Sequence, residues 1–139
     1  MRGIGEDNQG KGSFLYKNIQ MNYNKKMEIE PVLNELIENL KPADPLKIVL
    51  FGSYARGTAR EDSDIDLMVI LDNDYVAKSY TERMNRFLSV SRLIRGIHRK
   101  FAMDILVYSR KELGIIKNDG NDFIDEVEQT GRVLYEKAG

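Results

Sequence analysis

"LFGSYARGTAREDSDIDLMVIL", residues 50–71, carries the pattern from which the fold is predicted. An apolar run ends at a Gly-Ser pair, a polar segment follows, and a second apolar run begins at two aspartates separated by one residue. The apolar runs, 47–53 and 64–71, have the length and composition of buried strands. The segment between them begins with the spacing of a short helix. The stretch therefore predicts a strand, a tight turn, a short helix and a second strand.

Asp64 and Asp66 stand at the head of the second apolar run. Because side chains of a strand alternate between two faces, both carboxylates project from the same side, about 6.5–7 Å apart along the backbone. Like charges this close repel each other unless a positive group neutralises them. Mg²⁺ would do so, since it binds oxygen ligands and keeps coordination sites for water and phosphate. The alternative is a pair of solvated aspartates at a fraying strand edge.

A third carboxylate, Asp104, interrupts the apolar stretch "FAMDILVYS", residues 101–109, which predicts another strand. An unpaired buried carboxylate costs several kcal/mol, so we expect Asp104 to have a partner. If its strand lies beside residues 64–71, Asp104 completes a cluster of three carboxylates. The alternative is an aspartate on an edge strand that faces water.

The Gly52-Ser53 turn is a candidate phosphate site. A turn from a strand into a helix directs backbone N–H groups outward, where they favour phosphate. Gly52 lets the backbone approach a ligand closely, Ser53 can donate its hydroxyl, and Arg56 can add a charge-assisted contact. Alone, such a turn is an ordinary connection. Its fixed spacing from Ser63 and the two aspartates is what makes it informative.

The rest of the chain alternates helices with strands. Apolar positions three and four residues apart predict a helix that begins near Met27 and stops before Pro42, and a longer one over 78–98. The motif "SRKE" (109–112) is a capping box that opens another helix, and a further helix and a short strand close the chain. We expect a flexible leader over residues 1–26 and a single domain over 27–139.

Composition limits the classes of function. Of the 139 residues, 42% are hydrophobic and 31% charged, as in globular domains. The net charge of −1 argues against a nucleic-acid partner, so local charge must hold any anionic ligand. The chain has no cysteine, which excludes disulfides, thiolate zinc sites and cysteine nucleophiles. No apolar run reaches about 18 residues and no signal peptide is evident, so we expect a cytoplasmic protein without a membrane span.

The predicted helix over 78–98 and the residues just after it carry a basic face. We expect a solvated face; the alternative is a docking surface for an acidic partner. The single histidine, His98, lies amid this charge and is expected to be solvated as well. The basic residues are Arg83, Arg86, Arg92, Arg95, Arg99 and Lys100.

The motif "GSYARGTAREDSDIDL" resembles the signature of the polymerase-beta-type nucleotidyltransferase superfamily, and the short chain resembles its minimal nucleotidyltransferase branch. The resemblance covers about residues 29–137. It implies an α/β (α+β) fold, a small mixed β-sheet backed by helices. It also implies that Asp64 and Asp66 hold Mg²⁺ bound to a nucleoside triphosphate. Asp104 would then bind a second Mg²⁺ and help to deprotonate an acceptor hydroxyl.

The same resemblance assigns the β- and γ-phosphates to Gly52 and Ser53, with Arg56 and Ser63 as auxiliary residues. The implied reaction moves a nucleoside monophosphate, AMP from ATP by the family's tendency, to a hydroxyl acceptor. Minimal members commonly pair with a helical toxin of the HEPN type and act as its antitoxin, modifying a tyrosine. Two alternatives stay open: a non-catalytic nucleotide-binding module that acts by occlusion, and a small-molecule nucleotidyltransferase.

Overall fold

The computed structural model describes residues 29–139; the predicted leader, residues 1–26, lies outside them. The chain divides into two units, Met1–Val32 and Leu33–Gly139. Residues 29–40 are helical, and the strands found in the described residues belong to the second unit. Whether a single domain begins at residue 27 stays a prediction. None of the helices in the described part of the chain has the length and apolar content to cross a lipid bilayer.

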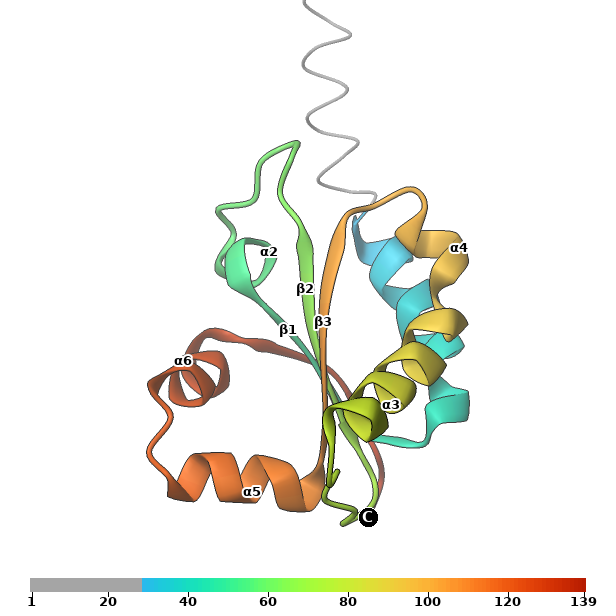
Figure 1. The fold of residues 1–139 in the computed structure, drawn as a ribbon. Coiled ribbons are helices and arrows are strands. Elements are labelled where there is room, and N and C mark those ends of the chain that lie inside the picture. Colours follow the sequence, from blue (N-terminus) through green and yellow to red (C-terminus); the bar gives the residue numbers. More distant parts are fainter. Residues whose placement is uncertain (1–28) are drawn as a thin grey trace, which may run out of the picture. The chain divides into compact units, whose positions relative to one another are not determined.

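A mixed four-stranded sheet forms the centre of the second unit (Figure 1). Its order is β3-β2-β1-β4, with β1 antiparallel to both β2 and β4, and β2 parallel to β3. The expected α/β class with a small mixed sheet is therefore confirmed. The strands are β1 (Pro45–Phe51), β2 (Ile65–Leu71), β3 (Met103–Ser109) and β4 (Arg132–Glu136).

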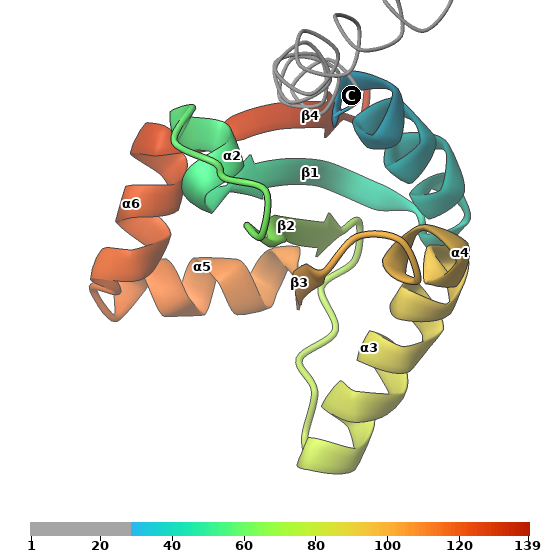
Figure 2. The ribbon, with the colours of Figure 1, turned by 90° about the horizontal axis from the view of Figure 1, so that it is seen from above.

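Helices cover both faces of this sheet. Figure 2 shows α5 (Arg110–Asn118) and α6 (Asp122–Thr130) on one side, and α3 (Tyr80–Leu93) and α4 (Arg95–His98) on the other. The short α2 (Gly52–Arg56) follows β1 directly, and a 3₁₀ turn (Lys41–Ala43) comes before β1. Because both faces are covered, the central strand β2 is buried at every position except Asp66.

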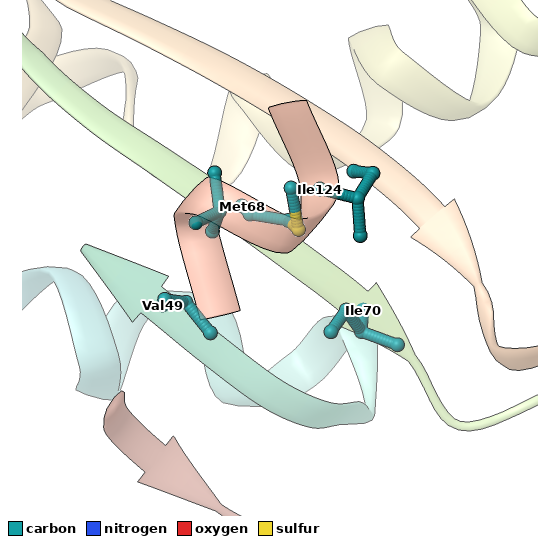
Figure 3. Packing of buried hydrophobic residues seen from close by; sticks show 5 residues of the cluster. Val49, Met68, Ile70 and Ile124 are labelled. Carbon is teal, nitrogen blue, oxygen red and sulfur yellow. The ribbon is translucent and has the colours of Figure 1, made fainter. Parts of the chain in front are cut away.

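Side chains that alternate along β1 and β2 supply the two apolar layers. On the α6 side, Val49, Met68 and Ile70 pack with Ile124 and Val127 (Figure 3). Residues at the alternate positions, such as Leu67, point to the other face and are fully buried. This packing fixes the register of β2, since a slip by one residue would put its apolar residues on the wrong face.

The structure differs from the prediction for one helix and agrees with it for another. The helix expected over 78–98 is broken, because the chain leaves helical geometry at the buried Ile94 and resumes as α4. The capping box is confirmed: the Ser109 hydroxyl accepts from the Glu112 N–H, and the Glu112 carboxylate accepts from the Ser109 N–H. Because this cap fixes the end of β3, it also fixes the direction in which α5 leaves the sheet.

Candidate active site

Two of the predicted catalytic carboxylates lie on neighbouring strands at the same level of the sheet. Asp66 is the second residue of β2, Asp104 is the second residue of β3, and they are register partners in the parallel pair. Asp64 lies just before β2. The prediction that the strand of Asp104 lies beside the strand of Asp66 is therefore confirmed.

Asp104 is not the buried carboxylate that its apolar surroundings predicted. It lies on β3, an edge strand, and its side chain is exposed, whereas Asp66 is half-buried. Its neighbours Met103 and Ile105 are buried because they point to the opposite face. The burial cost that was expected to demand a partner therefore does not arise. Asp104 is instead open to a ligand.

The electrostatics of Asp66 link the three carboxylates. Burial raises the pKa of Asp66, and the negative charges of Asp104 and Asp64 raise it further. The Arg56 guanidinium acts in the opposite direction but has the smallest effect of the four. This end of the sheet is therefore short of positive charge, and a cation would be attracted to it.

Gly52 makes room for the Asp66 carboxylate. Its φ is +73°, in the left-handed region that favours glycine, and a Cβ at this position would collide with Asp66 Oδ2. From the sequence, Gly52 was expected to allow the close approach of a ligand, whereas in the structure it allows the close approach of the Asp66 side chain. No side chain caps the start of α2, so its first N–H groups have no side-chain partner.

The remaining predicted residues lie around this turn in different roles. Ser53 is half-buried in α2, and Arg56 is the exposed last residue of that helix. The Ser63 hydroxyl accepts a hydrogen bond from the Arg60 N–H at 2.7 Å, and the Ser63 N–H donates to the Arg60 carbonyl at 3.1 Å. Ser63 therefore braces the loop that leads into β2, a role that its side-chain type alone did not signal.

A cavity of about 490 Å³ opens at the carboxylates, within the size range of ligand pockets. Its lining includes Gly52, Arg56, Asp66 and Asp104. Other elements contribute its remaining lining, and nothing in the sequence indicated that they meet there, because α3, α4 and α6 lie far apart along the chain. These residues include Phe87, His98, Phe123 and Glu126.

A family model described as "Polymerase beta, Nucleotidyltransferase" matches residues 33–138, which include the carboxylates, the turn and the cavity. The chain belongs to this family.

Three proteins of Methanocaldococcus jannaschii are similar to parts of this chain. "Putative protein adenylyltransferase MJ1305" is 51% identical over 45 residues (30% of this chain, 31% of the relative). "Putative protein adenylyltransferase MJ0604" is 38% identical over 66 residues (44% and 66%). "Putative protein adenylyltransferase MJ1379" is 50% identical over 50 residues (34% and 50%). The matched segments span from about a third to about two thirds of the length of these relatives.

Two solved structures are similar to this chain, and the first of them shows the same fold. One described as "a putative nucleotidyltransferase from Sulfolobus solfataricus" superposes with a TM-score of 0.55 at 22% identity, covering 82% of this chain and 86% of that one. A second, a "toxin-antitoxin with AMP-PNP", has a TM-score of 0.49 at 21% identity, covering 76% and 73%. At these identities the first likeness concerns the fold alone.

The donor chemistry of these carboxylates fits a hard divalent cation. Asp66 and Asp104 offer carboxylate oxygens in neighbouring register, and burial together with the charges of Asp104 and Asp64 raises the pKa of Asp66. Within residues 29–139, however, no three His, Cys, Asp or Glu side chains stand close enough together to hold a metal ion. The expected cluster of three carboxylates is thus not seen as an assembled metal site; its members interact through their charges.

Proposed function

We propose that this family member is a Mg²⁺-dependent nucleotidyltransferase that moves a nucleoside monophosphate from a nucleoside triphosphate to a hydroxyl group of a protein. One observation carries the proposal. Asp66 and Asp104 lie in register at the mouth of a cavity whose wall also contains Gly52 and Arg56, from the turn expected to hold phosphate. Phosphoryl-type transfer depends mainly on positioning and charge neutralisation, and these residues supply both.

ATP is the proposed donor and a protein the proposed acceptor. The three relatives from Methanocaldococcus jannaschii are named as protein adenylyltransferases, and their matched segments are 38–51% identical to this chain. The narrower form of the proposal is that the acceptor is a tyrosine of a HEPN-type toxin, which the chain would silence as its antitoxin. The support for this form is the resemblance to the minimal nucleotidyltransferase branch.

Each residue has a role in this proposal. Asp64 and Asp66 would hold Mg²⁺ with the triphosphate, and Asp104 would bind a second ion; bound Mg²⁺ supplies charge neutralisation at the phosphates. Ser53 donates its hydroxyl to a phosphate oxygen, Arg56 adds positive charge, and the backbone at Gly52 lies against the phosphates. The acceptor oxygen attacks the α-phosphorus, its proton passes to Asp104, and pyrophosphate leaves. Ser63 acts indirectly by holding the loop before β2.

A second candidate is a nucleotide-binding module that neutralises its partner by occlusion. The observation that favours it is the lack of an assembled three-ligand metal site within the described part of the chain. In this case nucleotide would bind at the same turn, but no transfer would follow.

Label transfer separates the two candidates. The protein is incubated with each α-³²P-labelled nucleoside triphosphate and Mg²⁺, alone and with the product of the adjacent gene, and label on protein is followed by electrophoresis. We expect transfer from ATP that Asp66→Asn and Asp104→Asn abolish. Nucleotide binding by calorimetry together with an absence of transfer in every condition would support the occlusion module and refute the enzyme.

A further inference from the structure

The free edge of β3 is lined by two cavities that meet. Beyond the active-site cavity, a second one of about 440 Å³ follows β3 between α3 and α5. Both cavities are lined by Phe87, Ile105 and Leu106, so they lie next to each other along the strand. In Figure 2 this edge of the sheet faces away from β1, and α3 and α5 diverge on its two sides. A groove therefore leads along β3 to the catalytic carboxylates.

The backbone of β3 has open hydrogen-bonding groups at one end of this groove. The Ile65 N–H donates to the Ala102 carbonyl at 2.9 Å, so even-numbered residues of β3 turn their backbone groups towards β2 and odd-numbered residues turn them outward. Farther along the edge, two of the outward groups are occupied. The Val107 carbonyl accepts from Arg86 Nη2 at 3.3 Å, and the Ser109 N–H donates to Glu112 Oε1 at 2.8 Å.

At the other end, the outward N–H and C=O groups of Met103 and Ile105 have no hydrogen-bond partner within residues 29–139. These two residues flank Asp104. An extended segment that paired with Met103 and Ile105 would place one of its residues directly opposite Asp104. That residue would be in register with both Asp104 on β3 and Asp66 on β2. Neighbouring strands lie about 4.8 Å apart, so a hydroxyl side chain at that position would lie next to the carboxylate proposed to accept its proton.

We infer that the acceptor protein presents its hydroxyl on an extended segment that adds to the free edge of β3, with the hydroxyl-bearing residue in register with Asp104. This inference rests on the proposed function and names its substrate class. Main-chain pairing gives affinity in this mode of recognition, and pockets beside the strand give specificity.

The second cavity indicates the composition of that segment. Its apolar lining includes three exposed side chains, Val76, Tyr80 and Ile115, which are 37%, 67% and 44% exposed. Its charged lining contains two arginines and one glutamate, and Arg86 pairs with Glu112 at 2.8 Å. Because Glu112 pairs with Arg86, the charged lining has one net positive charge, that of Arg83. The second cavity is therefore suited to a segment that contains apolar residues and one acidic residue.

Synthetic peptides test the strand geometry. Twelve-residue peptides, each with one central tyrosine, apolar flanks and one aspartate, are assayed as acceptors with the full chain, Mg²⁺ and α-³²P-ATP. The best acceptor is then N-methylated at one residue at a time. Because an added strand pairs through every second residue, N-methylation at alternate positions should lower transfer about tenfold and leave the intervening positions unchanged.

A pair of surface variants tests the groove. Ile115→Glu places a charge in the second cavity and should lower transfer to the peptide about tenfold. Val133→Glu is the matched control, because the exposed fraction of Val133, 50%, is similar to the 44% of Ile115, but Val133 lies on β4, the opposite edge of the sheet. Both variants should release pyrophosphate from ATP with water as the acceptor at the rate of the unmodified chain.

The outcomes distinguish this inference from the proposed function. A two-residue period in the N-methyl scan, together with a loss in Ile115→Glu alone, supports strand addition. Transfer to peptides without that period, equal effects of the two variants, or label that reaches only water or a folded protein would overturn it while leaving the enzyme intact. A chain that neither transfers label nor releases pyrophosphate would refute both.

Discussion

The two ends of β2 carry the same sequence pattern in opposite electrostatic settings. Asp64 and Asp66 stand at its start, and Asp72 and Asp74 follow its end, each pair separated by one residue. At the far end, Lys137 Nζ lies 2.7 Å from Asp72, and Arg110 lies 2.6 Å from Asp72 and 3.1 Å from Asp74. At the start, positive charge comes only weakly, from Arg56.

The pKa values of the two ends differ in direction for this reason. The hydrogen bond from Lys137, aided by the charges of Lys137 and Arg110, lowers the pKa of Asp72 in spite of burial. Burial and the neighbouring carboxylates raise the pKa of Asp66. An Asp-x-Asp motif therefore marks a ligand site only where the protein leaves its charge uncompensated.

The largest expected difference between the ends is in catalysis. Asp66→Asn removes a carboxylate that lies beside Asp104 in the proposed site, and we expect it to lower label transfer by roughly 10³-fold. Asp72→Asn makes the same chemical change at the ion-paired end and should leave transfer within about twofold. Transfer is measured at a temperature well below the midpoint of thermal unfolding of each variant.

A loss of transfer as large in Asp72→Asn as in Asp66→Asn would show that the two ends of β2 do not differ in their importance for transfer. Circular dichroism spectra of both variants serve as the control, since each should retain the fold of the unmodified chain.

A glycine pair tests how closely the active end is packed. Gly52 and Gly57 both have a positive φ, of 73° and 76°, so alanine strains the backbone at either position by about 1–2 kcal/mol. Only at Gly52 would the added Cβ meet the carboxylate of Asp66. We expect Gly52→Ala to lower transfer about 10- to 100-fold and Gly57→Ala to affect stability alone.

Equal transfer by the two alanine variants, measured with folded protein, would show that the position of Asp66 does not depend on the space left by Gly52.

Features that depend on neighbouring residues could be predicted from the sequence, whereas contacts between residues distant in the chain could not. The strands, the capping box at Ser109 and the turn at Gly52 follow from residues that are neighbours along the chain. The counter-ions of Asp72 do not, because Lys137 and Arg110 lie 65 and 38 residues away in sequence. A single sequence could thus locate both Asp-x-Asp motifs without showing which one is compensated. The edge position of Asp104 was likewise only one of two alternatives, because strand order is set by the packing of the whole sheet.

The ion-paired end should contribute to stability in a pH-dependent way. Because folding lowers the pKa of Asp72 below its usual value of 3.8, its contribution is present above that value and is lost as the pH falls through the lower, folded value. Asp72→Asn should therefore have a lower thermal midpoint than the unmodified chain at pH 7, and the difference should shrink towards pH 3. Differential scanning calorimetry between pH 3 and 7 measures both midpoints; a difference independent of pH would mean that the ion pairs are not its cause.

The smallest expected effect has the opposite sign and lies at the active end. Folding raises the pKa of Asp66 above its usual value of 3.8. The contribution of Asp66 to stability therefore falls as the pH rises from 3.8 through the folded pKa, and at higher pH its ionised carboxylate destabilises the fold. Asp66→Asn should therefore raise the thermal midpoint at pH 7 by about 2 °C and have less effect near pH 4. Mg²⁺ should raise the midpoint of the unmodified chain but not that of the variant, since a ligand stabilises only the form that binds it. A lower midpoint for Asp66→Asn in the absence of Mg²⁺ would mean that Asp66 is a structural residue, as Asp72 is, and that the two ends of β2 do not differ in kind.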